Sequence, residues 1–315
     1  MTGLGPNRSD ATASAGSDAE QAALMNQLER ELPPMNITDA EQLMREAKAA
    51  FDAHGVVFFL RQGTCLGAVR DGALIAWDDD LDLGSIIGMH GFSEALIAPV
   101  AETLRAGGCY VEVAREGLYT AVKIFKYRIR IDWQCYRVVQ GTIAHYPGVP
   151  FPASLFEELT PVDFIGDQYL VPSPPAAYLT FKYGPDWRTP KQVGYEKGVL
   201  DAMPPGSVPG RPGRLKQWFL VRFWPRQTGR LLVLDRNGDP VAGATVRIAG
   251  ISTSQTDRRG IVRFYLPVTE NYAVAVTANG VEEVLYEEKM EPGKTYVYRP
   301  DPEQTAGRYF VLTEA

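Results

Sequence analysis

The segment 77–84 has the sequence Trp-Asp-Asp-Asp-Leu-Asp-Leu-Gly, which places four carboxylates inside an otherwise apolar stretch. Side chains of a strand alternate between its two faces, so Asp78, Asp80 and Asp82 are predicted to share one face. Carboxylates on one face repel each other strongly unless a cation lies between them. Because apolar residues flank the run, it belongs at the edge of a core rather than in a solvated turn. The run therefore predicts a site for a hard divalent cation, Mg²⁺ or Mn²⁺, with oxygen ligands.

Other metal and nucleotide motifs fit this chain poorly. A calcium-binding EF-hand loop starting at Asp78 needs Gly at position six and Glu at position twelve, but these positions hold Leu83 and Met89. The sequence contains neither a P-loop nor a Rossmann glycine fingerprint. The three cysteines form no CxxC or Cys/His cluster, which argues against a zinc site and a disulfide scaffold.

A second acidic signal is Asp132, which stands alone in the strand-like apolar run 129–133. An isolated buried carboxylate is costly unless it is paired or bound to a metal, so Asp132 is a candidate third ligand. The alternative is an Asp at a strand edge that forms a hydrogen bond with a turn. The residue type alone leaves both interpretations open.

A third signal is the pair Gly63 and Thr64, which follows the apolar run 56–60 and precedes the acids. Glycine lets the backbone approach a phosphate closely, and the start of a following helix favours an anion. Arg70, Lys123 and Arg130 are candidate phosphate-binding cations, with Arg70 ranked first, although each residue type is more often an ordinary surface charge.

Together these signals have the order of the nucleotidyltransferase superfamily: a strand, Gly-Ser/Thr, Asp-x-Asp on a second strand and one Asp on a later strand. Residues 58–84, with the sequence FFLRQGTCLGAVRDGALIAWDDDLDLG, resemble the signature of the LicD/fukutin family. The later segment from Tyr169 to Pro190 resembles that family's closing motif. The resemblance covers about residues 45–192, and it implies a nucleotidyltransferase-like mixed sheet with flanking helices.

The resemblance also implies a chemistry. Members of the family transfer a phospho-alcohol, such as phosphocholine or a polyol phosphate, from a CDP-activated donor to a sugar hydroxyl of a surface glycan or lipid-linked saccharide. Carried over by motif, Asp80, Asp82 and Asp132 form the catalytic and metal-binding set. Asp78 is a further candidate metal ligand, and Gly63, Thr64 and Arg70 are expected to hold the donor's phosphates.

Two other functions compete with this hypothesis. A glycosyltransferase could use Asp80-Leu81-Asp82 as a DxD motif for a sugar nucleotide, although that leaves Gly63, Thr64 and Asp132 without a role. A catalytically inactive glycan-binding protein would not need intact acids at all three positions. A net charge of −6, from 32 basic and 38 acidic residues, argues against a nucleic-acid partner.

The length and composition predict two domains in a soluble, cytoplasmic protein. The chain has 315 residues, 45% of them hydrophobic, and domains average roughly 150 residues. It begins without the apolar run of a secretory signal, and no stretch is long and apolar enough to span a membrane. We therefore expect a cytoplasmic location, with contact to the inner membrane face as a further possibility raised by residues 211–227.

We predict an α+β catalytic domain followed by an all-β sandwich. The predicted map has five parts: a disordered tail (1–30), the catalytic domain (31–203), a linker (204–228), the sandwich (229–300) and a C-terminal tail (301–315). The sandwich resembles carboxypeptidase-regulatory-like domains in Asn237–Ala244 and in Thr256–Gly260. Residues 211–227 are basic and aromatic, which favours a helix packed between the domains over a peripheral membrane contact.

Within the catalytic domain the pattern predicts alternating helices and strands. A helix should begin at Thr38, where Thr38 and Glu41 form a capping box. We expect a strand over residues 56–60, a short helix within 63–72 and a helix over 93–105. Residues 109–139 should form two to four strands.

Overall fold

The computed structural model describes residues 8–145, 149–192, 228–266, 269–301 and 311–315. The chain divides into two compact units. The first contains residues 1–115, 120–136 and 159–172, and the second contains residues 116–119, 137–158 and 173–315. Because the second unit draws in segments from within residues 31–203, the units do not coincide with the predicted domain map, whose boundaries stay predictions.

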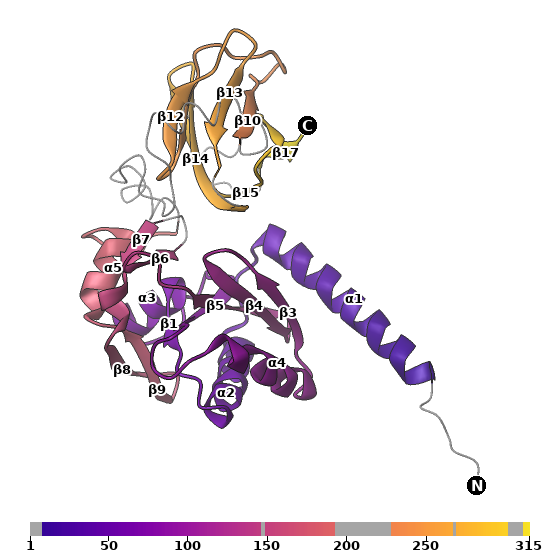
Figure 1. The fold of residues 1–315 in the computed structure, drawn as a ribbon, viewed down its shortest axis with the longest axis vertical. Coiled ribbons are helices and arrows are strands. Elements are labelled where there is room, and N and C mark those ends of the chain that lie inside the picture. Colours follow the sequence, from indigo (N-terminus) through magenta and orange to yellow (C-terminus); the bar gives the residue numbers. More distant parts are fainter. Residues whose placement is uncertain (1–7, 146–148, 193–227, 267–268, 302–310) are drawn as a thin grey trace. The chain divides into compact units, whose positions relative to one another are not determined.

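A five-stranded mixed sheet organises the first unit (Figure 1). Its order is β1-β2-β5-β4-β3, in which β2 and β5 pair in parallel while β1 with β2 and β3 with β4 pair antiparallel. The strands are β1 (Phe59–Leu60), β2 (Asp80–Ile86), β3 (Tyr110–Arg115), β4 (Tyr119–Lys126) and β5 (Ile129–Tyr136). Helices beside a mixed sheet confirm the predicted α+β class.

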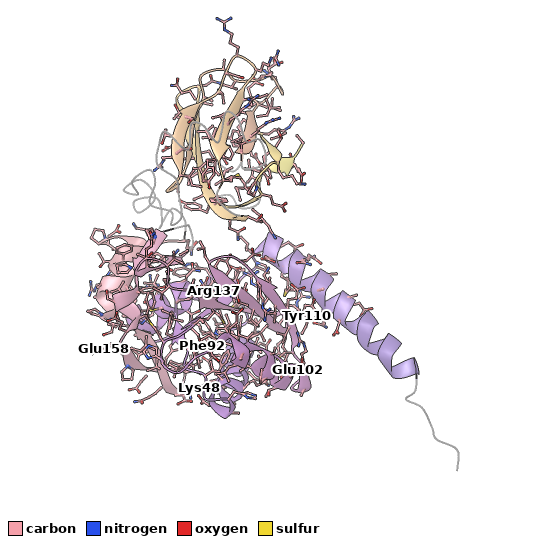
Figure 2. The ribbon with its side chains drawn as sticks, in the orientation of Figure 1. Lys48, Phe92, Glu102, Tyr110, Arg137 and Glu158 are labelled. Carbon is pink, nitrogen blue, oxygen red and sulfur yellow. The ribbon has the colours of Figure 1, made fainter. Side chains whose placement is uncertain are left out.

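One face of this sheet packs on helices and the other is polar. Alternate residues of β5 are fully buried. The Trp133 ring packs edge-on against Phe51 of α2 (Ile37–Ala53) and at a tilt against Phe92, with ring centroids 4.7 and 5.7 Å apart. Phe92 thus lies in the interior with the apolar side chains around it (Figure 2). Helix α4 (Ile97–Ala106) contacts α2 and β3. The residues between the buried ones point to the opposite face, and there the sheet carries its charged side chains.

The local elements follow the sequence with small corrections. Helix α2 begins one residue before Thr38, and its cap is Asn36, whose side chain accepts a hydrogen bond from the Asp39 amide. An Asn satisfies a free helical N–H as well as Thr does, so the capping box at Thr38 was the wrong choice. The predicted short helix is α3 (Gln62–Arg70). The strand expected over 56–60 is confined to β1, since only its last two residues pair with β2.

The structure describes a helix where the sequence predicts a disordered tail. Helix α1 (Arg8–Glu31) is anchored through its last turns, where Met25 is 1% exposed and Glu29 accepts hydrogen bonds from Lys123 at 2.6 and 2.8 Å. The composition argument missed this because it weighed only the small polar residues at the start. A buried Met and a paired Glu offset the entropy of ordering the later residues.

The second unit contains short elements and two four-stranded sheets. The short elements are β6 (Thr142–His145), β7 (Val149–Pro152) and α5 (Pro175–Tyr183), while the hairpin β8 (Leu159–Phe164) and β9 (Asp167–Pro172) belongs to the first unit. The sheets have the orders β13-β10-β16-β17 and β12-β11-β14-β15. Side chains from both sheets, including Val246, Phe264 and Leu285, form one buried core. The strands are β10 (Thr228–Val233), β11 (Thr245–Ile248), β12 (Ser252–Gln255), β13 (Ile261–Tyr265), β14 (Glu270–Ala278), β15 (Val281–Met290), β16 (Thr295–Tyr298) and β17 (Thr313–Glu314).

The last residues are held by this unit rather than forming a free tail. Strand β17 pairs with β16, and the buried Glu288 accepts hydrogen bonds from the amides of Val311 and Leu312, each at 2.8 Å. Of the predicted C-terminal tail over 301–315, residues 311–315 are thus attached to this unit, and residues 302–310 lie outside the described part of the chain. Buried Glu288 needs donors, and the backbone amides supply them.

Two predicted segments lie mostly or wholly outside the described residues. The predicted linker 204–228 lies outside the described residues except for Thr228, and the basic aromatic segment 211–227 lies wholly outside them. Among the helices in the described part of the chain, none is long and apolar enough to cross a membrane.

Candidate functional site

The parallel pairing of β2 and β5 brings the predicted acids together. Asp82 lies directly opposite Asp132 in the ladder, and Asp80 lies opposite Arg130. Residues paired across a ladder, and residues two apart along a strand, point to the same face. Asp80, Asp82 and Asp132 therefore share the polar face of the sheet, as the sequence predicts.

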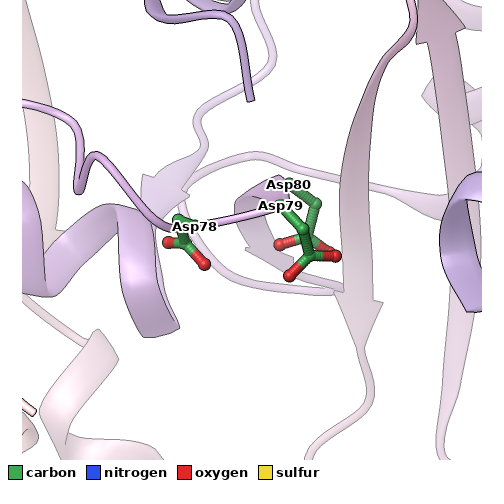
Figure 3. A group of neighbouring side chains, drawn as sticks. All are labelled: Asp78, Asp79 and Asp80. Carbon is green, nitrogen blue, oxygen red and sulfur yellow. The ribbon is translucent and has the colours of Figure 1, made fainter. Parts of the chain in front are cut away.

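Asp78 and Asp79 join this group from the turn that precedes β2. Carboxylate oxygens of Asp78, Asp79 and Asp80 all lie within 4.8 Å of one another. Figure 3 shows the carboxylates of Asp79 and Asp80 side by side, with that of Asp78 turned toward the end of a helix. Since β2 begins only at Asp80, Asp78 does not belong to the strand, and the predicted alternation holds from Asp80 onward.

Helix α3 begins against these acids. A Cβ atom added to Gly63 would overlap a carboxylate oxygen of Asp78, so a larger residue here would displace that side chain. Thr64 is 2% exposed, and its hydroxyl accepts a hydrogen bond of 2.8 Å from the Asp82 amide. The predicted phosphate-binding pair thus lies at the acid cluster, and the Thr64 side chain fixes the start of β2 to α3.

Sequence reasoning missed Arg61, which is the most buried cation at the site. It is 2% exposed and pairs with Asp82 through a distance of 2.8 Å between Nη2 and Oδ1. Its guanidinium also donates to the carbonyls of Leu83 and Asp132, at 2.9 and 3.3 Å. Arg61 therefore crosslinks β2 and β5 beside the acids. An arginine directly after a buried strand was the available signal.

Arg130 lies among the carboxylates on the other side of the cluster. It forms ion pairs with Asp80, with Asp79 at 3.5 Å and with Asp132 at 3.3 Å. Arg130 Nε and Asp132 Oδ1 are buried, and neither makes a hydrogen bond among the described residues. Asp132 thus has a buried acceptor oxygen that its ion pair leaves without a donor.

Asp78, Asp79 and Asp80 have pKa values above the ordinary value of an aspartate. Burial raises the pKa of Asp78 well above its usual range, and the charges of Asp80 and Asp82 raise it further. Burial and then the charge of Asp80 raise the pKa of Asp79 to about 7. Burial also raises the pKa of Asp80, against the lowering effect of Arg130. The protein alone therefore stabilises these carboxylates poorly as anions.

This donor set fits a hard divalent cation. The converging groups are all carboxylates, which Mg²⁺ and Mn²⁺ prefer, and a cation would relieve the repulsion that raises their pKa values. The closest group is Asp78, Asp79 and Asp80. Asp82 and Asp132 lie beside this group on the same face. Asp82 also pairs with Arg61 at 2.8 Å, and Asp132 pairs with Arg130 at 3.3 Å.

Two predicted cations pair with carboxylates other than those of the cluster. Arg70 is at the last turn of α3, seven positions from Gly63, and it is engaged with Asp71 through hydrogen bonds of 2.7 to 3.1 Å. With a rise of about 1.5 Å per residue, this separates Arg70 from the start of α3 by roughly 10 Å. Lys123 on β4 is paired with Glu29. The phosphate-binding role of Arg70 remains a prediction, and the structure brings Arg61 and Arg130 to the acids instead.

Comparison with known proteins gives matches in the part of the chain that holds the site. A family model described as "LicD/FKTN/FKRP, nucleotidyltransferase domain" matches residues 55–174. Human ribitol 5-phosphate transferase FKRP is 30% identical over 165 residues, covering 50% of this chain and 33% of the relative. The mouse protein of the same name is 29% identical over 161 residues, covering 49% and 33%. The chain thus spans about a third of the length of these relatives.

Among solved structures, one match is a crystal structure of ANT(2")-Ia in complex with adenylyl-2"-tobramycin. It has 16% identity, covers 42% of this chain and 68% of that chain, and has a TM-score of 0.29, which is too low to establish a shared fold. The family match rests on the sequence and includes every predicted site residue from Gly63 to Asp132. Residues 55–174 of this chain therefore form a LicD/FKTN/FKRP nucleotidyltransferase domain.

Proposed function

We propose that this protein is a Mg²⁺- or Mn²⁺-dependent phosphotransferase that moves a phospho-alcohol from a CDP-activated donor to a sugar hydroxyl. The acceptor is a cell-surface glycan or a lipid-linked saccharide. The proposal is supported by the family match of residues 55–174 and by the similarity to ribitol 5-phosphate transferases. The observation that carries it is the register of β2 and β5, which sets Asp82 beside Asp132 with Asp80 on the same face.

The acids have different roles in this proposal. Asp80 and Asp82 would hold the metal, with Asp78 or Asp79 adjoining them, and a bound ion would supply charge neutralisation for the transferred phosphoryl group. Asp132 lies on another strand and has a buried oxygen without a donor, Oδ1. We assign Asp132 the role of accepting the proton of the attacking sugar hydroxyl, because a general base needs a free acceptor within hydrogen-bond reach.

The cations position these groups. Arg61 holds Oδ1 of Asp82 at 2.8 Å and so fixes the orientation of this carboxylate. Arg130 offsets the negative charge of the acids, and its planar guanidinium is suited to bind a phosphate oxygen of the donor. Gly63 at the start of α3 lets a donor phosphate approach the backbone. Phosphoryl transfer depends chiefly on such positioning and charge neutralisation.

The test is the identity of the nucleotide product. We expect CDP-ribitol or CDP-choline to release CMP in the presence of Mg²⁺, and excess EDTA to abolish the release. Asp80→Asn should remove activity while the protein stays folded, because it removes a metal ligand and also a repelling charge. Glu102→Gln, on an exposed face of α4, is the matched control and should retain wild-type turnover.

A different product would support a different enzyme. Release of UDP or GDP from a sugar nucleotide would favour a glycosyltransferase that uses Asp80 and Asp82 as a DxD motif. Full turnover in EDTA would contradict the metal requirement. Binding of glycan without turnover of any nucleotide would favour a catalytically inactive glycan-binding protein.

A further inference from the structure

A cavity of about 330 Å³ adjoins the acid cluster in the first unit. Its wall includes Asp79 and Arg130, so its inner end lies at the charged groups of the site. Apolar side chains form most of the remaining wall, including Met25 and Leu28 of α1 and Phe125 of β4. A volume of this size is at the lower end of the range for small-molecule sites. The cavity therefore has room for one small organic group beside the acids.

The turn between β4 and β5 also lines this cavity, and it has an unusual backbone. Tyr127 and Arg128 both have positive φ, 57° and 63°. Two-residue hairpin turns of this kind strongly favour Asn-Gly, because side chains with a Cβ resist the left-handed conformation. The chain uses glycine at the second position of two comparable turns, at Gly166 and Gly280. Residues 127 and 128 thus carry large side chains at positions where the backbone favours glycine.

The two side chains of this turn, Tyr127 and Arg128, differ in their polar contacts. The Tyr127 hydroxyl accepts a hydrogen bond of 2.9 Å from Gln42 and donates one of 3.0 Å to Glu46. Tyr127 is therefore held in place by α2. Arg128 is exposed and makes no ion pair or hydrogen bond within the described part of the chain. The cavity thus presents an unpaired guanidinium on a strained turn, where strain in a backbone is often associated with function.

We propose that this cavity binds the nucleoside monophosphate part of the donor and that Arg128 is a binding residue for it. The proposal rests on the proposed function for the choice of a nucleotide. A nucleobase has flat apolar faces and a polar edge, which suits a cavity whose wall combines apolar side chains with polar ones, the Arg128 guanidinium among them. A polyol or sugar has a hydroxyl on nearly every carbon and would leave those groups unpaired against Met25, Leu28 and Phe125. The Asp79 and Arg130 end then places the phosphate beside the acids.

The experiment compares nucleotide affinity in the full-length wild type and in Arg128→Gly. Glycine adopts the left-handed conformation at no steric cost, so this variant should fold at least as well as the wild type. Loss of charge-assisted hydrogen bonds should weaken CMP binding, measured by calorimetry with Mg²⁺, by about tenfold to a hundredfold. The affinity for Mg²⁺ alone and for ribitol 5-phosphate should be unchanged. Arg258→Ala, an exposed turn arginine in the second unit, is the matched control and should bind CMP like the wild type.

A second variant tests the cavity without touching its charges. Leu28 is only half-buried, so Leu28→Trp can fill the cavity and should also weaken CMP binding at least tenfold. Wild-type CMP affinity in both variants would overturn the inference, even if CDP-alcohols are turned over. If the wild type instead binds UMP or GMP and Arg128→Gly weakens that binding, the cavity assignment stands and the proposed donor is wrong. Failure of the wild type to bind CMP, UMP, GMP and AMP would overturn the inference.

Discussion

Asp132 differs from the other acids of the site in its strand and in its hydrogen bonding. It lies on β5, whereas Asp80 and Asp82 lie on β2, and its buried Oδ1 makes no hydrogen bond within the described residues. We predict that Asp132→Asn keeps donor and metal binding nearly intact, since the remaining acids and the substrate phosphates still surround the ion. The chemical step should fall roughly 10²–10⁴-fold if Asp132 is the general base. Single-turnover rates beside calorimetric donor binding measure the two effects separately.

A purely structural role for Asp132 gives the opposite result. The substitution would then change stability by ~1 kcal/mol and leave turnover nearly unchanged. Asp163→Asn, on β8, is a control at a carboxylate that is not in the cluster. Equal turnover in wild type and Asp132→Asn would remove Asp132 from the catalytic set.

Asp79 is an acid whose protonation should affect stability near neutral pH. Its pKa of about 7 lies above the ordinary value because of burial and the charge of Asp80. A carboxyl with a raised folded-state pKa stabilises the fold below its unfolded pKa of about 4, and this contribution is lost as the pH rises through about 7. In EDTA, the melting temperature should therefore fall between about pH 5 and pH 8.

Substitution of Asp79 should remove part of this pH dependence. Asp79→Asn cannot ionise, so at pH 8 in EDTA we expect a higher melting temperature than in the wild type, by about 2–4 °C for each ~1 kcal/mol recovered. Saturating Mg²⁺ should narrow the difference, because the ion offsets the same repulsion. Thermal unfolding followed by circular dichroism at both pH values measures it. A lower melting temperature for Asp79→Asn in EDTA would contradict the electrostatic argument.

At the scale of elements, the crosslink between β2 and β5 depends on Arg61. This arginine joins Asp82 on one strand to the Asp132 carbonyl on the other, inside the protein. Arg61→Met removes the cation and leaves a buried carboxylate without its ion pair, a change that typically costs about 3–5 kcal/mol. Arg61→Lys keeps the charge but cannot bridge both strands, so it should recover part of the stability.

Magnesium affinity shows whether Arg61 orients Asp82 for the metal or only stabilises the fold. Because Arg61 orients Asp82, we expect Arg61→Lys to bind Mg²⁺ more weakly than the wild type even at temperatures where both are fully folded. Calorimetric titration with Mg²⁺ at 15 °C, after circular dichroism has established the folded fraction, provides the comparison. Equal affinity in a folded Arg61→Lys would limit Arg61 to a structural role.

The elements themselves were largely predictable because their signals are local. The Asp-Leu-Asp alternation and the isolated Asp132 depend on a period of two, and both lie on strands as predicted. The contacts of Arg61 and Arg130 were not predictable, since they arise from the parallel register of β2 and β5, which joins residues about 50 positions apart. The cap at Asn36 was missed because Asn36 and Thr38 are both good cap residues and only the backbone decides between them.

At the scale of the whole molecule, the site belongs to the first unit. The acids, Arg61, Arg130 and the cavity lie on segments of that unit, and the eight strands of the two C-terminal sheets lie in the second. We therefore predict that the chain beyond residue 227 is not needed for donor binding or for release of CMP. A chain ending at Gln227 should bind CMP and Mg²⁺ as the full chain does, and it should turn over the donor slowly with water or a simple sugar as acceptor.

Truncation exposes whatever surface the removed sheets cover, so cleavage of the intact protein is the sharper experiment. A protease site inserted within residues 204–213, which are rich in Pro and Gly, allows the folded protein to be cut after purification. We expect the cut protein, with both fragments present, to release CMP at a rate within about tenfold of the uncut protein. The isolated N-terminal fragment should then retain this rate while its preference among acceptor glycans is free to change. A soluble fragment that still binds CMP and Mg²⁺ but releases no product would show that the C-terminal sheets take part in the chemistry.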